Sequence, residues 1–289
     1  MSLLEVKGLH KEYKNFTLDN ISFDLPKGYI MGYIGENGAG KTTTINLITK
    51  LCRAKKGKVK IDGVTYEENP IAYKESIGYV GDESYFPKEF KIKDVKRILK
   101  QFFPSFREQE FDHLIQKWNL PENKKMSEFS RGMKVKLMFA SILSRDTKIL
   151  ILDEATNGLD PIIRDEVIHI LQDYIEDGEK SILFSTHVLA DLDKIADYII
   201  FIHQGRLVFQ GLKEELEESY LLIKGKKEDM NEKLGKKIIG KTQGEFGFEG
   251  IIKADLAPEF GKRFLYAKPN IDQIMLHFVK NGGIIHEGN

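Results

Sequence analysis

The octapeptide at residues 35–42, Gly-Glu-Asn-Gly-Ala-Gly-Lys-Thr, constrains the fold of this chain more than any other feature. It matches G-x-x-x-x-G-K-[ST], the loop that cradles phosphates between a strand and a helix. The apolar run 29–34 before it can form a buried strand, and the run 42–48 after it can begin a helix. Free backbone N–H groups and the helix dipole then favour an anion at the loop, which a chance glycine-rich turn would not explain.

Each residue type in this loop has a physical role. Glycines lack a Cβ, so the backbone can bend and approach phosphates closely. Lys41 can reach the β- and γ-phosphates, and the Thr42 hydroxyl can ligate Mg²⁺. The nucleotide-binding residues predicted here are Asn37, Gly38, Ala39, Gly40, Lys41, Thr42 and Thr43.

The composition fits a globular protein and gives no sign of a nucleic-acid binder. The chain of 289 residues is 41% hydrophobic and 30% charged, enough for a substantial core. Its 44 basic and 44 acidic side chains cancel, whereas nucleic-acid binding favours a basic excess. The N-terminal residues do not resemble a signal peptide, and no apolar run approaches the ~20 residues of a membrane helix. We therefore expect any membrane role to act through a partner.

Strands and helices alternate along the middle of the chain, which indicates a doubly wound α/β core. The first 65 residues are expected to be a mostly antiparallel β region, with an Asp-Gly turn at 62–63. Apolar residues at helical spacing predict an inserted helical subdomain at about 83–143. The predicted strands are 3–8, 18–25, 77–80, 148–152, 181–185, 198–203 and 206–209, and the predicted helices are 92–102, 111–118, 132–143, 161–175 and 188–196.

The character of the chain changes after about residue 213. Residues 240–265 mix glycines with short β-like runs, and a last helix is predicted at 269–280. We expect residues 1–213 to form the main domain and residues 214–289 a small α+β accessory domain.

A second chemical element follows the loop. Residues 149–154 form an apolar strand that ends in two acids, Asp153 and Glu154. The strand would deliver Asp153 beside the glycine loop, where it can hold Mg²⁺ with Thr42. Glu154, one residue further, can face an attacking water and act as general base.

Further motifs occur in a set order. Ser130-Arg131-Gly132-Met133 opens a predicted helix, the acids run on through Ala155-Thr156-Asn157-Gly158-Leu159-Asp160-Pro161, Ser185-Thr186-His187 follows a strand, and Tyr13 precedes Lys41 by 28 residues. Together with the loop, this ordered set resembles the ATP-binding subunit of an ABC transporter, over at least residues 3–213. The resemblance implies a P-loop ABC-type ATPase core with an antiparallel β subdomain and an inserted helical subdomain.

The resemblance also implies a role for each motif. Tyr13 would stack on adenine, and His187 would contact the γ-phosphate and the attacking water. The residues implied to contact ATP bound by an opposing subunit are Ser130, Arg131, Gly132 and Asp160. Two chains would then face head to tail around two ATP molecules and part after hydrolysis.

Two positions depart from the family pattern. Where the family has Leu-Ser-Gly-Gly-Gln, this chain has residues 129–133 with Arg131 at the third place. Arg131 can reach the partner's nucleotide or point to solvent. Asp82 takes the place of a glutamine, and it can ligate Mg²⁺ or be a solvated loop acid. The predicted metal ligands are therefore Thr42, Asp82 and Asp153.

The expected function is ATP hydrolysis coupled to transport through a separate transmembrane permease, at the cytoplasmic face of the cell membrane. The implied cofactors are ATP and Mg²⁺, and the implied partners are the permease and a second ATPase subunit, identical or related. No nucleic acid is expected as a partner. The single ATPase unit, the altered motifs and the short appendage are similar to bacterial exporters of peptides and antimicrobial compounds. In the family, the segment after Asp82 helps to receive the permease; Tyr85, Phe86 and Phe90 could line that groove or belong to the core.

Three other functions stay open on the sequence. A soluble ABC ATPase acting on DNA or ribosomes would carry a long coiled coil or two ATPase units, and neither is visible. A GTPase would carry Asn-Lys-x-Asp, but Asn123-Lys124-Lys125 is followed by Met126. A non-catalytic binding module would not need Glu154 and His187.

Overall fold

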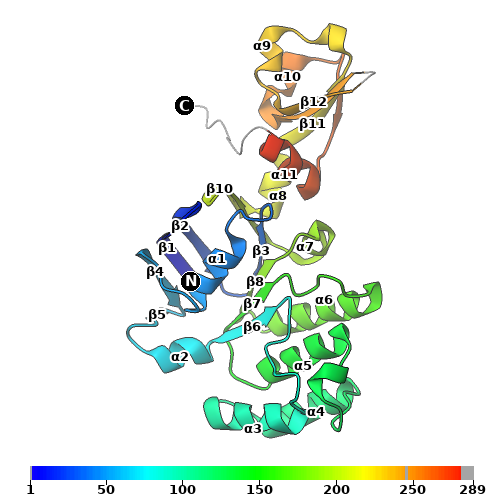
Figure 1. Cartoon of the computed structure of the whole chain (residues 1–289). Coiled ribbons are helices and arrows are strands. Elements are labelled where there is room, and N and C mark those ends of the chain that lie inside the picture. Colours follow the sequence, from blue (N-terminus) through cyan, green and yellow to red (C-terminus); the bar gives the residue numbers. More distant parts are fainter. Residues whose placement is uncertain (1, 245–246, 281–289) are drawn as a thin grey trace.

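Three β-sheets organise the protein, whose computed structural model describes residues 2–244 and 247–280 (Figure 1). The first sheet is antiparallel, with strand order β2-β1-β4-β5. Its strands are β1 (Ser2–Tyr13), β2 (Phe16–Pro26), β4 (Lys56–Ile61) and β5 (Val64–Thr65). Asp62 and Gly63, both at positive φ, make the expected turn between β4 and β5. β1 and β2 are longer than predicted, because pairing with neighbours continues beyond their alternating segments.

The second sheet is the mostly parallel α/β core, with strand order β10-β9-β3-β8-β7-β6. The pairs among β9, β3, β8, β7 and β6 are parallel, and β10 adds an antiparallel edge. The strands are β3 (Ile30–Ile34), β6 (Ile77–Gly81), β7 (Ile149–Asp153), β8 (Ser181–Ser185), β9 (Tyr198–His203) and β10 (Arg206–Leu212). The continuous apolar sequences of β3, β7 and β8 are fully buried, as in parallel strands covered on both faces.

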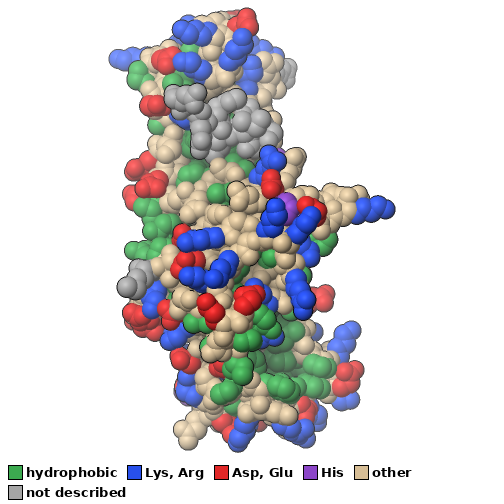
Figure 2. Space-filling view, turned by 90° about the vertical axis from the view of Figure 1, so that its left-hand side faces the viewer, with side chains coloured by type: hydrophobic (Ala, Val, Ile, Leu, Met, Phe, Trp, Pro, Cys, Tyr) green, Lys and Arg blue, Asp and Glu red, His purple; other side chains and the backbone are tan. Residues whose placement is uncertain are grey.

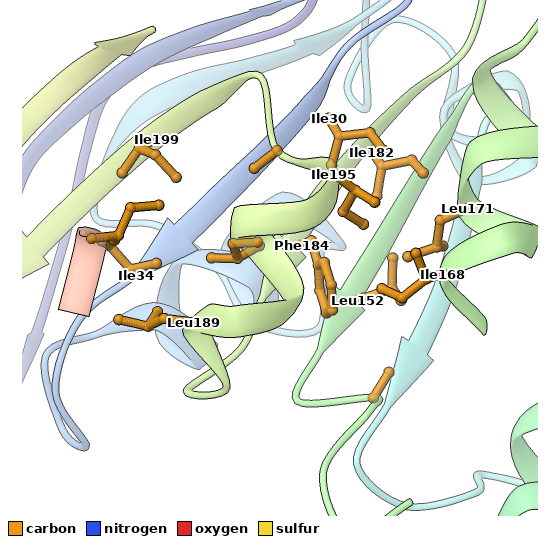
Figure 3. Close-up of a cluster of buried hydrophobic side chains, with 14 of the residues drawn as sticks. Ile30, Ile34, Leu152, Ile168, Leu171, Ile182, Phe184, Leu189, Ile195 and Ile199 are labelled. Carbon is orange, nitrogen blue, oxygen red and sulfur yellow. The ribbon is translucent and has the colours of Figure 1, made fainter. Parts of the chain in front are cut away.

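Two hydrophobic clusters cover the two faces of this sheet. Side chains alternate along a strand, so Ile30 and Ile34 join one cluster while Met31 and Tyr33 join the other. Figure 3 shows the first cluster, which combines strand residues such as Phe184 with Ile168 and Leu189 from the covering helices. That face carries α5 (Arg131–Leu143), α6 (Pro161–Ile175) and α7 (Leu189–Ile195), and the other carries α1 (Lys41–Ile48) and the antiparallel sheet.

The helical subdomain is confirmed as a set of helices between β6 and β7. A third cluster joins α3 (Ile92–Phe102), α4 (Glu108–Lys117) and α5, and its buried members include Leu99, Phe111 and Leu137. The short helix α2 (Pro70–Glu75) precedes β6 and begins with Asn69, whose side chain accepts a hydrogen bond from the Ala72 N–H. In the described part of the chain, no helix combines the length and apolar character needed to cross a membrane.

The third sheet begins after β10 and has strand order β12-β13-β11-β14. The remaining elements are α8 (Lys213–Glu218), β11 (Tyr220–Gly225), α9 (Glu232–Gly235), β12 (Ile239–Gln243), β13 (Phe248–Lys253), α10 (Ala257–Phe260), β14 (Leu265–Ala267) and α11 (Ile271–Lys280). The last helix begins at Ile271 instead of 269, because Asn270 caps it through the Gln273 N–H at 2.9 Å.

Helix α11 joins the third sheet to the α/β core. Phe278 stacks on Phe201 of β9 with ring centroids 6.1 Å apart, and meets Tyr220 edge-on at 5.2 Å. Residues 214–280 therefore share part of their core with the main domain. The predicted boundary at 213/214 falls inside the connection between β10 and β11, and residues 281–289 of the predicted accessory domain lie outside the described residues.

Candidate functional site

Four segments that follow parallel strands meet at one edge of the central sheet. The register aligns Asp153 with Ser185 on β8 and with Gly81 on β6, and Tyr33 on β3 also pairs with Ser185. The carboxyl ends of these strands therefore lie together, which is where α/β sheets bind ligands. A cleft of about 630 Å³ opens there, lined by Asn37, Thr42, Tyr79, Gly81, Asp82, Glu83, Asp153, Glu154, Asn157 and His187.

The glycine loop after β3 is packed tightly against its surroundings. A Cβ on Gly40, at φ 111°, would lie 2.9 Å from side-chain atoms of Phe16 and Leu18, so only glycine fits without displacement. Lys41 is 6% exposed and donates to the carbonyls of Gly35 at 2.7 Å and Glu36 at 3.3 Å. Its Nζ lies 3.8 Å from Glu154 Oε1. The loop thus delivers a buried cation to the predicted general base.

The β9–β10 turn supports this loop, which the sequence did not indicate. The Gly205 N–H donates to the Ala39 carbonyl at 2.9 Å, and His203 Nδ1 lies 3.2 Å from Glu36 Oε2. Gly205, at φ 77°, leaves no room for a Cβ, which would lie 2.0 Å from the Thr17 carbonyl oxygen. The predicted strands 198–203 and 206–209 imply a turn at this place, but its contact with a loop far along the chain was not visible in the sequence.

Glu154 and His187 form a direct pair. Glu154 Oε2 lies 2.6 Å from His187 Nδ1 and accepts the His187 backbone N–H at 3.1 Å. Glu154 has φ 57°, an unusual value for a residue with a side chain. Strained backbone of this kind is concentrated at functional sites, where the surrounding structure enforces it. The arrangement aims a carboxylate into the cleft with its orientation fixed by an imidazole.

Asp153 is buried beside the glycine loop. Burial raises the pKa of its carboxyl, while the neighbouring Thr42 hydroxyl opposes that shift and the charge of Glu154 adds to it. Its Oδ1 atom has no hydrogen-bond partner in residues 2–244 and 247–280. In the same residues, no cluster of three or more His, Cys, Asp or Glu side chains could hold a metal ion by itself. Thr42 and Asp153 suit a hard cation that takes most of its oxygens from phosphates and water.

Tyr13 lies at the end of β1, outside the lining of the cleft. Its ring is 49% exposed, with Phe16 at a centroid distance of 6.5 Å and Lys11 Nζ at 5.6 Å. The Thr43 hydroxyl and the Cys52 thiol neighbour its own hydroxyl. An exposed aromatic face therefore stands next to the first turn of α1, at the side of the phosphate loop.

The residues predicted to act across a subunit interface do not line the cleft of their own chain. Ser130 caps α5 by accepting the Met133 N–H at 3.2 Å, and a Cβ on Gly132 would lie 3.2 Å from Ile163 of α6. Asp160 caps α6, because its Oδ1 accepts the N–H groups of Ile162 and Ile163, each at 3.1 Å. The capping role was missed, although an acid directly before a proline at a helix start is its usual signal.

Arg131 and Asp82 are brought together by the fold. They form an ion pair, with side chains 38% and 49% exposed. The sequence left Arg131 open between the partner's nucleotide and solvent, and left Asp82 open between a metal ligand and a solvated acid. Within one chain, each instead faces the other.

Other residues of the site were missed from the sequence. Tyr79 lines the cleft, and burial together with the charge of Asp153 raises its pKa to about 12. Asp191 on α7 is buried and accepts the Thr156 hydroxyl at 2.9 Å, which holds the segment after Glu154 to the helix after His187. Alternation along β6 places Tyr79 on the same face as Gly81, but no sequence signal pointed to Asp191.

A second, apolar groove lies on the side of the molecule where α2 meets the helical subdomain. Its volume is about 520 Å³, and it is lined by Thr49, Leu51, Lys74, Ile77, Tyr79, Tyr85, Phe86, Pro87, Phe90, Ile98, Leu99, Phe103, Ser141 and Arg145. All three of these aromatics line the groove. Tyr85 is half-exposed, whereas Phe86 and Phe90 also pack on the hydrophobic cluster of the helical subdomain. Figure 2 views the molecule from the left-hand side of Figure 1, and hydrophobic side chains gather in the lower part of that view.

Comparison with known proteins gives a consistent result. The family described as ABC transporter matches residues 18–157. The chain is 30% identical to the ABC transporter ATP-binding protein YtrB of Bacillus subtilis, over 76% of each chain. It is 31% identical to the lantibiotic transport ATP-binding protein SrtF of Streptococcus pyogenes, over 75% of this chain and 96% of that protein. A solved ATP-binding subunit of an ABC transporter superposes with a TM-score of 0.68 at 26% identity, over 75% of this chain and 92% of the other.

Proposed function

The chain belongs to the family of ABC transporter ATP-binding proteins, and we propose that Glu154 and His187 are the residues with which it hydrolyses ATP. It is an ATPase subunit that powers transport across a membrane. The observation that carries the residue assignment is the 2.6 Å contact between Glu154 Oε2 and His187 Nδ1 in the cleft beside Lys41.

We propose a step in hydrolysis for each of these groups. Lys41 binds the β- and γ-phosphates, since its ammonium group is held at the glycine loop. Glu154 orients a water and takes its proton as the water attacks the γ-phosphate. His187 keeps the Glu154 carboxylate in place through Nδ1 and presents the rest of its ring to the cleft. Tyr13, beside the first turn of α1, offers a flat partner for adenine.

Thr42 and Asp153 are proposed to hold Mg²⁺ together with the phosphates. When bound, this ion neutralises charge on the β- and γ-phosphate oxygens. The unpartnered, buried Oδ1 of Asp153 supports the assignment, because a buried carboxylate oxygen needs a cation or a donor. Asp82 is the weakest of the three predicted ligands, because its carboxylate already has a cationic partner in Arg131.

Two copies of the chain, or one copy with a related ATPase, are proposed to close around two ATP molecules. The N-terminus of α5 is a second anion site, with Ser130 as its cap. It does not line the cleft of its own chain, which supports a role towards the nucleotide of the opposing subunit. Asp160 at the start of α6 would lie at the same interface.

The apolar groove is proposed to receive a cytoplasmic helix of the permease, which would place the chain at the cytoplasmic face of the membrane. Its lining is mostly aromatic and aliphatic, and its charged members, Lys74 and Arg145, are cations. A helix with apolar residues and an acid would complement it. The likeness to SrtF, whose name refers to lantibiotic transport, supports export of peptides or antimicrobial compounds as the direction of transport.

Replacement of Glu154 by Gln tests the general base. The amide keeps the size of the side chain but cannot take a proton, so phosphate release should slow by about 10²-fold or more, while ATP binding persists. In size-exclusion chromatography with ATP and Mg²⁺, the variant should accumulate as an ATP-bound dimer. The control, Lys41→Ala, should lose binding as well as hydrolysis. Phosphate release at the parent rate by Glu154→Gln would show that another group takes the proton.

A further inference from the structure

The ion pair between Asp82 and Arg131 joins two segments that serve different parts of the reaction. Asp82 lies in the loop after β6, and Arg131 is the first residue of α5, next to the Ser130 cap. β6 and α5 pack together in the fold (Figure 1). The Arg131 guanidinium also lies near Gly158, four residues after Glu154, since a Cβ on Gly158 would lie 3.6 Å from Arg131 Nε. One side chain therefore pairs with the loop after β6 and lies beside the segment after Glu154, and both of these segments border the cleft.

The pair stands in the wall between two cavities. Asp82 lines the nucleotide cleft of about 630 Å³ and also a neighbouring cavity of about 330 Å³. Arg131 lines only the neighbouring cavity, together with Lys134. The Arg131 Nε atom is buried, with no hydrogen-bond partner in the described part of the chain. The guanidinium is thus held mainly through the Asp82 carboxylate.

The negative charge of the cleft lining explains how the Asp82–Arg131 ion pair can affect nucleotide binding. The cleft lining contains the acids Asp82, Glu83, Asp153 and Glu154, and within the described residues it contains no Lys or Arg. Lys41 is the nearby cation. A triphosphate entering this cleft meets carboxylates that are negatively charged, as it is itself. Each carboxylate without a cationic partner opposes binding of the triphosphate. An arginine paired with Asp82 cancels the repulsion between the Asp82 carboxylate and the triphosphate.

We propose that Asp82 and Arg131 are positioning residues that act as one electrically neutral unit, in which Arg131 cancels the charge of Asp82 beside the triphosphate and fixes the loop after β6 to the start of α5. The proposal rests on the assignment of this cleft to ATP. Its main consequence is an asymmetry. Loss of Arg131 alone leaves a bare carboxylate at the cleft, whereas loss of both partners leaves none.

Nucleotide binding by the full chain tests this asymmetry. The variants are Arg131→Met, Asp82→Asn and the double variant, with Lys134→Met as control, because Lys134 lines the same neighbouring cavity without lining the cleft. Calorimetry with ATP and with ADP, in EDTA, measures affinity without any contribution from Mg²⁺. Thermal unfolding of each variant reports its stability separately.

Arg131→Met should bind ATP about three- to tenfold more weakly than the parent, and ADP should be affected less because it carries less negative charge. The double variant and Lys134→Met should bind within about twofold of the parent. The loss in Arg131→Met should shrink at about 1 M salt, where charges more than about 3 Å apart are screened. Arg131→Lys, which keeps the charge, should behave as the parent.

A purely mechanical clamp would give a different pattern and would overturn the proposal. The double variant would then bind as poorly as Arg131→Met, and ATP and ADP would lose affinity equally. Should Arg131→Met not fold, Asp82→Asn decides the question: tighter ATP binding, caused by the freed Arg131, supports the neutral unit, and unchanged or weaker binding overturns it. If the parent bound no ATP while being folded, the nucleotide site itself would be wrong, independently of the pair.

Discussion

At the scale of single residues, the cleft holds groups in states that cost stability. Glu154 is at φ 57°, and Asp153 is a buried carboxylate whose pKa is raised mainly by burial. Both features are unfavourable for the isolated chain and useful for a cleft that receives a cation and a phosphate. The sequence motif predicted which acids would be there, but it could not predict the strain or the burial.

Asp153→Asn should separate stability from activity. An acid whose folded pKa lies above its unfolded value destabilises the fold once it is ionised. The cost is absent well below the ordinary aspartate pKa of 3.8, grows as the pH rises through the raised folded pKa, and is complete above it. The variant without nucleotide should therefore be more stable than the parent at pH 7, by about 1 kcal/mol, and this difference should shrink toward pH 4. Denaturant unfolding at several pH values measures it.

The same variant should lose Mg²⁺-dependent ATP hydrolysis, because an amide is a poor ligand for Mg²⁺. Asp193→Asn is the control, since desolvation also raises the pKa of Asp193, which is more exposed than Asp153 and does not line the cleft. It should keep full hydrolysis. Destabilisation of Asp153→Asn at neutral pH would contradict the argument from burial.

At the scale of elements, helix starts carry more of the proposed chemistry than helix bodies. The phosphate loop runs into α1, Ser130 caps α5 and Asp160 caps α6. Free N–H groups and the dipole make each of these ends suitable for an anion. Asp160 therefore has two roles that need separating, the cap observed here and the proposed contact with the opposing subunit.

Asp160→Ala and Asp160→Asn separate those roles. Alanine cannot cap α6, so the variant should lose about 1 kcal/mol of unfolding free energy, whereas asparagine caps almost as well as aspartate and should change stability by a few tenths of a kcal/mol. If Asp160 also contacts the opposing subunit, Asp160→Asn should weaken the ATP-dependent dimer in a Glu154→Gln background. Sizing chromatography with ATP reads this out, and an unaltered dimer would leave Asp160 with the capping role alone.

At the scale of the whole molecule, two sites lie on either side of Tyr79, which lines both the nucleotide cleft and the apolar groove. A partner seated in the groove would therefore touch a residue that also touches the site of hydrolysis. The third sheet is attached elsewhere, through the contact of Phe278 on α11 with Phe201 on β9 (Figure 1).

Leu51→Glu should block docking of the permease and leave the isolated ATPase intact. Leu51 is 69% exposed and lines the groove, so a charge there opposes an apolar partner without disturbing the core. Ile71→Glu is the matched control, because Ile71 on α2 is also 69% exposed but does not line the groove. Co-expressed with its permease, the chain should be found with membranes as parent and as Ile71→Glu, but not as Leu51→Glu. Equal membrane association of all three would place the permease elsewhere.

The sequence by itself determined the order of the core elements, because burial on both faces of a parallel sheet requires continuous apolar strands, and these stand out between amphipathic helices. It also predicted the motif residues Lys41, Asp153, Glu154 and His187, which lie at the ends of such strands or in the segments that follow them. The capping of α6 by Asp160 had a local signal that was missed. The lengths of β1 and β2 and the attachment of α11 were not predictable, because they depend on pairing and packing between distant segments.

Only the tertiary structure decided which side chains share a site. The pairing of β3, β7 and β8 in register brings Glu154 within 2.6 Å of His187, although 33 residues separate them. In the same way, the packing of α5 on β6 makes partners of Asp82 and Arg131, two residues that the sequence presented as unrelated departures from a motif. Local patterns report burial and backbone conformation, whereas contact between distant charges exists only once the chain has folded.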